Sequence, residues 1–305
     1  MTAASVAEKP GAQLRQPSPV VEQMLGELAG QARTRRTATL CYSALVIACL
    51  AVSAWMSDVS PAALARGLPR VGAYFEQLVP HLQASNLFGG VKTEGSLAYW
   101  FYRLDSWAWL LLETSQMALL ATLMGGIVAF LASFIAAANL APSRGVHLLT
   151  RRTLELFRCV PDIVYALILV WAFGVGPMAG IFAIALHTVG ALGKQFAEVD
   201  ENIDMGPWEA VRATGGTWAQ AVRFAVLPAV LPNFLSYFLL RFEINVRGAT
   251  VIGFVGAGGI GQELYQVISS SYYEEVSAII VLIVVTVSCI DLVSERLRSF
   301  AMGAA

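Results

Sequence analysis

Hydrophobic residues along this sequence gather in long runs that contain no charged side chain. Stretches that contain charged residues separate the runs, which cover residues 37–57, 114–143, 163–193, 224–240 and 276–290. A helix needs about 20 mostly apolar residues to cross the hydrocarbon core of a bilayer. Several of the runs reach this length with their flanking residues, and a soluble protein seldom contains even one. The pattern therefore predicts an all-α integral membrane protein.

The run at 163–193 is too long for one span, and the sequence GVGP at 174–177 interrupts it near its middle. Glycine and proline favour a turn at this point, which divides the run between two helices. We therefore expect about six transmembrane helices, with limits near 37–57, 114–140, 156–174, 177–198, 223–246 and 275–295.

Composition supports this class and excludes others. Hydrophobic residues make up 57% and charged residues 13% of the 305 positions, whereas a soluble domain has roughly 25% charged residues. The net charge of −1 gives no field that would attract nucleic acid. The cysteines and histidines are scattered, without the spacing of a metal site or a disulfide framework. We expect this chain to bind no metal and no cofactor.

Positive charge predicts the orientation, because short cytoplasmic loops carry an excess of lysine and arginine. Arginines cluster before the first span, after the second and after the last, at Arg33, Arg35, Arg36, Arg144, Arg151, Arg152, Arg296 and Arg298. Six spans place the three clusters on one side, so both termini are predicted to be cytoplasmic. Residues 1–36 then form a polar cytoplasmic tail, 37–57 the first transmembrane helix, 58–113 an extracytoplasmic connection and 114–298 the main transmembrane domain.

The connection before the fifth span contains a short segment between two breaks. Gly-Pro at 206–207 interrupts the chain, residues 208–214 can form one short helix, and Gly-Gly at 215–216 stops it. Thr217 is a good N-cap for a second helix. Such a helix is either a compact knob that meets a cytoplasmic partner or an ordinary amphipathic loop helix at the membrane surface.

This segment resembles a known family. Permease subunits of ABC importers carry E-A-A, three residues, G, nine residues and I-x-L-P, which this chain matches with Glu209, Ala210, Gly215, Leu227 and Pro228. Val211 and Ala225 depart from the pattern by modest apolar exchanges. The resemblance implies a type I, MetI-like permease fold. It also implies that residues at about 206–216 form the coupling helix that docks into an ATPase subunit, with Arg212 beside Glu209 on its surface.

Two further regions, Val160–Asp204 and Leu239–Leu264, look like the corresponding parts of phosphonate importer permeases. The resemblance implies an importer of phosphonates or a related phosphorus oxyanion in the bacterial inner membrane. It also implies a homodimer that works by alternating access with a cytoplasmic ATPase dimer and an extracytoplasmic binding protein. The chain has no G-x-x-x-x-G-K-[ST] motif, so ATP and Mg²⁺ are expected in the partner ATPase.

Three alternatives remain open at the level of the sequence. The first is an ABC permease for another substrate, such as phosphite, phosphate or methionine. The second is an ion-coupled secondary transporter, which would need no ATPase. The third is a membrane-embedded oxidoreductase that uses a glycine-rich motif after the fifth span.

Charged residues follow the fifth apolar run, where charge near the hydrocarbon is costly. Glu243 and Arg247 are spaced i,i+4 and can pair if the helix continues. The alternatives are an interhelical ion pair that fixes the gate, an interface charge outside the apolar core, and a polar lining of the translocation path. We predict that Glu243, Asn245, Arg247 and Thr250 line this path or its gate. Arg247 is the best candidate to bind an oxyanion, because a guanidinium matches it bidentately.

The glycine-rich motif lies in FVGAGGIGQEL, residues 254–264, and matches the G-x-G-x-x-G of dinucleotide-binding turns. Such a turn requires a strand–helix unit in a parallel sheet, and no such pattern surrounds it. We interpret the glycines as sites of backbone freedom and close packing at the outer membrane face, against a second copy or a docked binding protein. They are Gly253, Gly256, Gly258, Gly259 and Gly261. A bulky residue at Gly258 or Gly259 is expected to impair transport.

Overall fold

The computed structural model describes residues 19–57 and 60–303. Throughout these residues the chain forms helices joined by turns and short loops, and it contains no β-strand there. The chain divides into two compact units, Met1–Tyr74 and Phe75–Ala305. The predicted all-α membrane class is confirmed, since five helices are long and apolar enough to span a membrane, or six if one bent pair is counted as a span.

The first unit contains α1 (Pro19–Met56) and most of α2 (Pro61–Leu78). Residues 30–56 of α1 can cross a membrane, and their apolar side chains are exposed, as lipid-facing side chains are. α1 begins at Pro19, so the second half of the predicted polar tail at 1–36 is helical. The first half of that tail lies outside the described residues.

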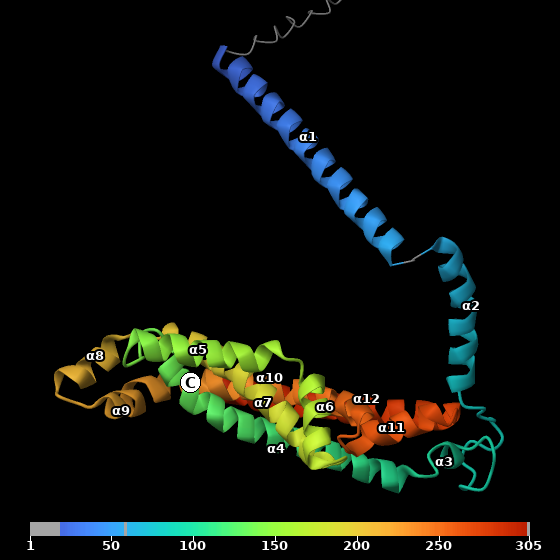
Figure 1. Ribbon diagram of the computed structural model, residues 1–305. Coiled ribbons are helices and arrows are strands. Elements are labelled where there is room, and N and C mark those ends of the chain that lie inside the picture. Colours follow the sequence, from blue (N-terminus) through green and yellow to red (C-terminus); the bar gives the residue numbers. More distant parts are fainter. Residues whose placement is uncertain (1–18, 58–59, 304–305) are drawn as a thin grey trace, which may run out of the picture. The chain divides into compact units, whose positions relative to one another are not determined.

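Four long helices of the second unit run lengthwise beside one another (Figure 1), namely α4 (Leu104–Ala136), α7 (Pro177–Glu201), α10 (Leu227–Ile252) and α12 (Tyr273–Gly303). α4 and α7 approach closely because a glycine leaves room between them. A Cβ atom at Gly125 would lie 2.7 Å from the carbonyl oxygen of Ala185. Small residues are the usual means by which helices pack closely inside a membrane.

Short helices mark the two ends of this bundle (Figure 1). The end that we call the α8 end holds the C-termini of α4 and α7, together with α8 (Gly206–Ala213) and α9 (Trp218–Ala221). The opposite end, which we call the α11 end, holds α3 (Leu97–Trp100) and α11 (Gly259–Ser269), beside the N-terminal parts of α4 and α12.

A bent pair of helices carries the chain back between α4 and α7. Because α4 and α7 both end at the α8 end, the intervening chain must return to the α11 end. It does so through α5 (Arg144–Cys159) and α6 (Asp162–Phe173), which are bent by 83°. Pro161 disfavours helical geometry at the preceding residue and donates no backbone hydrogen bond, which explains the break. The predicted third span at 156–174 is therefore not one continuous helix, and counting the bent pair as one span keeps the predicted number of six.

The remaining spans match the predicted ones with shifted limits. α4 begins at Leu104, which shortens the predicted connection at 58–113, and the fifth span extends from Trp218 to Val255. This span contains a π-helical turn at Val222–Val226, directly before Pro228. Proline cannot donate to the preceding turn, and a π turn absorbs this irregularity without ending the helix.

Aromatic side chains form the core toward the α8 end. Phe134, Phe196 and Phe234 come from α4, α7 and α10, and each is at most 4% exposed. The rings of Phe196 and Phe234 are stacked, with centroids 4.1 Å apart. Their packing joins the three helices directly beside the short helices of this end.

Candidate coupling and translocation sites

α8 forms a short knob with one attached face and one free face. Trp208 and Val211 are spaced i,i+3 and half-buried, and Trp208 packs against the aromatic core. Glu209 and Ala210 are exposed on the other face. The helix ends before Gly215, whose φ of 84° suits glycine. The predicted short helix is confirmed, and Glu209 is exposed on its free face.

The break between α8 and α9 is fixed by side-chain hydrogen bonds. Arg212 Nη1 donates to the carbonyl oxygen of Gly216 at 2.8 Å, so this exposed arginine also closes the turn. Thr217 caps α9 as predicted, because its side chain accepts from the backbone of Gln220. Gln220 Oε1 accepts from the backbone N–H of Thr217 at 2.7 Å, which completes a capping box. These contacts give the knob a defined shape.

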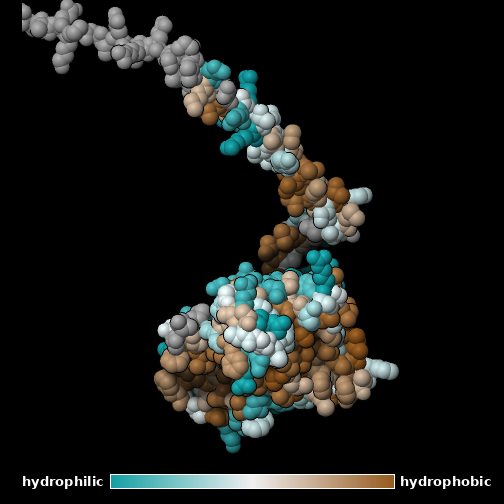
Figure 2. Space-filling model, turned by 90° about the vertical axis from the view of Figure 1, so that its left-hand side faces the viewer, coloured by the Kyte–Doolittle hydropathy of each residue, from teal (hydrophilic) through white to brown (hydrophobic). Residues whose placement is uncertain are grey.

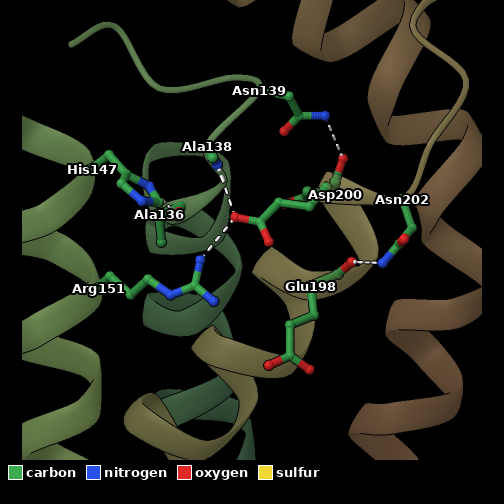
Figure 3. A network of polar contacts seen from close by, with 9 residues as sticks. Ala136, Ala138, Asn139, His147, Arg151, Glu198, Asp200 and Asn202 are labelled. Atoms are coloured by element: carbon green, nitrogen blue, oxygen red, sulfur yellow. Dashed lines mark hydrogen bonds and ion pairs between the residues drawn. The ribbon is translucent and has the colours of Figure 1, made fainter. Parts of the chain in front are cut away.

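Polar contacts join the C-terminal ends of α4 and α7 to each other and to α5 (Figure 3). Glu201 Oε1, at the end of α7, accepts from the backbone N–H of Ala138 and from Arg151 Nη1, each at 2.9 Å. Figure 3 shows Ala138 and Arg151 approaching from the segment after α4 and from α5. No local pattern in the sequence predicts this network, because Ala138 and Arg151 precede Glu201 by 63 and 50 residues.

Two further hydrogen bonds attach the segment after α4 to its neighbours. Asn139 Nδ2 donates to the main-chain oxygen of Asp200 at 2.9 Å, and Trp218 Nε1 donates to the carbonyl oxygen of Leu140 at 2.8 Å. α8 and α9 are therefore mounted on the ends of α4 and α7. A force applied to the knob acts on two helices of the bundle.

Replacing Arg151 by glutamine is expected to lower thermal stability, because Glu201 loses a half-buried cationic partner. We expect a cost of about 1 kcal/mol. Arg152→Gln is the matched control, because Arg152 is 75% exposed and pairs with Glu155 at i,i+3 on the same helix. Melting of the purified variants in detergent measures both effects, and equal shifts would contradict a stabilising role for the network.

The polar residues predicted to line the path occupy different environments on α10. Glu243 and Asn245 are buried, at 7% and 3% exposed, whereas Arg247 is exposed. Glu243 lies 4.0 Å from Arg298, and Arg247 Nη2 donates to both carboxylate oxygens of Asp291 at 3.0 Å. The i,i+4 pair that the spacing allows is not formed, because each residue pairs with α12, as the interhelical alternative expects.

Asn245 acts as an interhelical contact. Its Nδ2 donates to the Oγ1 atoms of Thr122 and Thr188, at 2.8 and 2.9 Å, which connects α10 to α4 and α7. Thr250 Oγ1 donates to the carbonyl oxygen of Val246 within its own helix, at 3.3 Å. A role of these residues in the translocation path stays a prediction.

A charged group without an assigned role lies midway along α10. Arg241 donates to His187 Nδ1 and, at 3.5 Å, to Thr188 Oγ1. A guanidinium only donates, so His187 accepts at Nδ1 and is neutral in this arrangement. The ion pairs of the described residues do not include Arg241. A charge at the middle of a spanning helix costs about 2.5–3.5 kcal/mol on insertion scales, and such residues usually serve function.

The glycine-rich turn packs against its own chain. A Cβ atom at Gly261 would overlap the carbonyl oxygen of Thr250, and one at Gly259 would overlap Thr114 Oγ1. Thr114 Oγ1 accepts from the backbone N–H of Ile260 at 2.9 Å. The predicted close packing is present within this chain, where the partners are α4 and α10, and packing against a second copy or a binding protein stays a prediction. The turn joins helices, so it lacks the strand of a dinucleotide site.

The surface of the second unit agrees with a position across a membrane. Figure 2 looks onto the α8 end, where hydrophilic residues gather, while hydrophobic residues cover the flanks. Exposed apolar side chains of the flanks include Leu120, Ile127, Leu131, Val284 and Val285. The α8 end is therefore suited to a membrane surface, with the knob in water.

A comparison with protein families gives the class of this chain. The model of the family described as "Binding-protein-dependent transport system inner membrane component" matches residues 129–300, which include the knob, the fifth span and the glycine-rich turn. The chain belongs to this family. It is a multi-pass membrane permease of the ABC importer class, and the oxidoreductase alternative is excluded.

Relatives of this permease extend over most of its length. The phosphite transport system permease protein PtxC of Stutzerimonas stutzeri is 36% identical over 80% of this chain and 90% of its own. A second phosphite transport permease of that organism, HtxC, is 34% identical over 87% of each chain. The phosphate-import permease protein PhnE of Mycolicibacterium smegmatis is 34% identical over 81% of this chain and 43% of its own.

Solved structures confirm the predicted fold of the permease. An inward-facing structure of the MetNI methionine ABC transporter matches with a TM-score of 0.56 at 22% identity, covering 64% of this chain and 95% of that chain. A bacterial ABC transporter involved in alginate import matches with a TM-score of 0.51 at 15% identity, covering 75% and 88%. The type I, MetI-like permease fold is thus shared.

Proposed function

We propose that this permease is the membrane-spanning subunit of an ATP-driven importer of phosphonates or a related phosphorus oxyanion in the bacterial inner membrane. The observation that carries the proposal is the identity of 34–36%, over at least 80% of this chain, with permeases named for phosphite and phosphate. The printed name of a shorter relative in Escherichia coli, 48% identical over 39% of this chain, refers to phosphonate transport.

The proposed transporter is an assembly of several chains. Two copies of this permease form the membrane part, a cytoplasmic ATPase dimer holds ATP and Mg²⁺, and an extracytoplasmic binding protein delivers the anion. The exposed face of α8 with Glu209 and Ala210 supports a docking role toward the ATPase. The absence of a G-x-x-x-x-G-K-[ST] motif from the sequence supports a separate ATPase.

The proposed orientation places the α8 end in the cytoplasm. Arg144, Arg151 and Arg152 lie in α5, whose start follows the α8-end terminus of α4, and short cytoplasmic segments are enriched in arginine. The bent pair of α5 and α6 counts as one crossing, so six crossings bring both termini to the cytoplasmic side. The predicted connection after α1 then lies outside.

Alternating access is the proposed mechanism. ATP binding closes the ATPase dimer, and the knob transmits this motion to α4 and α7 through the contacts of Asn139, Leu140 and Glu201. The helices of the two permeases then open outward to receive the anion from the binding protein. Hydrolysis restores the inward-open state.

Growth on defined phosphorus sources tests the proposal. A strain that lacks the gene is expected to lose uptake of methylphosphonate, phosphite or phosphate, and the restored gene should return it. Inactivation of the partner ATPase should abolish the same uptake, because the permease has no energy source of its own. Uptake that survives without the ATPase would indicate a secondary transporter, and restored methionine uptake alone would indicate another substrate class.

A further inference from the structure

A polar cavity of about 560 Å³ lies near the α8 end, between α7 and the first half of α10. The part of its wall that comes from α7 includes Gln195, Glu198 and Asn202, and the part from α10 includes Asn233 and Tyr237. Such a row of polar side chains on two spanning helices would be costly against lipid. It is suited to a water-filled passage.

Polar side chains on α7 and on α10 continue from the cavity toward the middle of the bundle. Tyr237 and Arg241 are one turn apart on α10, at i and i+4, and therefore lie on the same face. Along α7, His187 lies two turns before Gln195 on the side that meets Arg241. The cavity and the Arg241–His187 pair thus lie along one route from the α8 end to the centre.

We propose that this route is the anion passage of the permease, and that Arg241 is the guanidinium that binds the phosphorus oxyanion in transit. The inference rests on the proposed function and specifies its site. His187 and Thr188 each accept one hydrogen bond from Arg241 and fix its position, which leaves further N–H donors of the guanidinium for a ligand. An oxyanion is the ligand whose geometry suits these donors.

Arg247 is the competing candidate, and its contacts differ from those of Arg241. Asp291 engages the Arg247 guanidinium with both carboxylate oxygens at 3.0 Å, so its charge is already neutralised. Within the described part of the chain, no carboxylate lies within 4.0 Å of Arg241. A passing anion would therefore compensate the charge of Arg241 without displacing a carboxylate.

Acidic groups near the route set limits on how tightly an anion is held. Asp162, at the start of α6, lies against Gly248, two turns beyond Arg241 on α10. Glu198 and Asp204 line the cavity toward the α8 end. These carboxylates disfavour an anion at either side of Arg241, so they weaken its binding and leave Arg241 as the favourable position on the route. A passage requires such weak binding, because the anion must also leave.

Transport by the complete complex in proteoliposomes tests the inference. The proteoliposomes contain the permease and its ATPase, and phosphite-loaded binding protein is added at a saturating concentration. Phosphite uptake and ATP hydrolysis are measured in the same samples. Arg241→Gln is expected to lower uptake by about tenfold, the loss of one charge-assisted contact. ATP hydrolysis stimulated by the binding protein should persist within about threefold, because the knob is unchanged. Arg241→Lys should retain intermediate uptake, and Arg247→Gln should lower uptake less than Arg241→Gln does.

A second pair of variants keeps the test decisive if Arg241→Gln does not assemble. Asn233 is exposed in the cavity, so both Asn233→Glu and Asn233→Lys should fold. An added carboxylate repels an anion and an added ammonium attracts it, so uptake by the glutamate variant should be about threefold lower than by the lysine variant.

Three results would overturn the inference. They are wild-type uptake by Arg241→Gln, equal uptake by the two Asn233 variants, and a loss of uptake confined to Arg247→Gln. A wild-type complex that hydrolyses ATP but takes up none of phosphite, phosphate and methylphosphonate would instead overturn the proposed function, and the inference with it.

Discussion

Glu209→Lys is expected to abolish uptake while the permease itself remains folded. Glu209 is exposed in the first turn of α8 and forms no ion pair with the described residues. A lysine there meets the positive end of the helix dipole, which costs only about 0.5 kcal/mol at an exposed position. The large effect arises at the proposed ATPase interface, where the reversed charge faces groups suited to a carboxylate.

Copurification of the ATPase with the tagged permease measures this effect beside uptake. Asp105→Lys is the matched control, because Asp105 is also an exposed acid in the first turn of a helix, but at the α11 end. Its ATPase should copurify normally. Gly215→Asp is a second test of the coupling role, because it strains the left-handed turn after α8 and adds a charge to the knob. Normal uptake by both Glu209→Lys and Gly215→Asp would refute the coupling role.

Gly261→Ala is expected to reduce the folded yield and to lower uptake by about tenfold. The added methyl group would overlap the carbonyl oxygen of Thr250, which is main chain and cannot rotate away. Relief of this overlap requires α10 and α11 to separate, at a cost of about 3 kcal/mol. Gly259→Leu should act in the same direction, because it combines a φ of 70° with an overlap at Thr114.

Gly145→Ala is the matched control for both glycine variants. Gly145 lies in the first turn of α5, and a Cβ atom there would meet nothing within 4 Å. Alanine is the better helix former, so this variant should be as stable as the wild type or more so. Gel filtration in detergent measures the folded yield, and uptake is measured in cells. A Gly261→Ala protein with normal yield and uptake would contradict the close packing of the turn.

Local sequence properties predicted a large part of this molecule. Apolar runs identified the spanning helices, and the pattern from Glu209 to Pro228 identified both the knob and the family. Thr217 was predicted as a helix cap, and its capping box with Gln220 is present. Each of these features depends on residues that are close in sequence, because helix length, helix ends and caps are set within a few turns.

Predictions that depended on contacts between helices were less successful. Glu243 and Arg247 have the spacing of an ion pair within one helix. In the structure, however, Glu243 pairs with Arg298 and Arg247 pairs with Asp291, both on α12. An i,i+4 pair contributes only a few tenths of a kcal/mol, so a partner on a neighbouring helix easily displaces it.

The sequence by itself determined that this protein is a helical membrane permease, where most of its spanning helices lie, and that a short helix stands between two breaks before the fifth span. Only the tertiary structure decided that α5 and α6 share one bent crossing, that the glycine-rich turn packs on its own α4 and α10, and that Arg241 is held by His187 without a carboxylate. Hydrophobicity and backbone preference are properties of short segments. The partners of a charged or small residue depend on which helix faces meet, and that is set by the packing of the whole bundle.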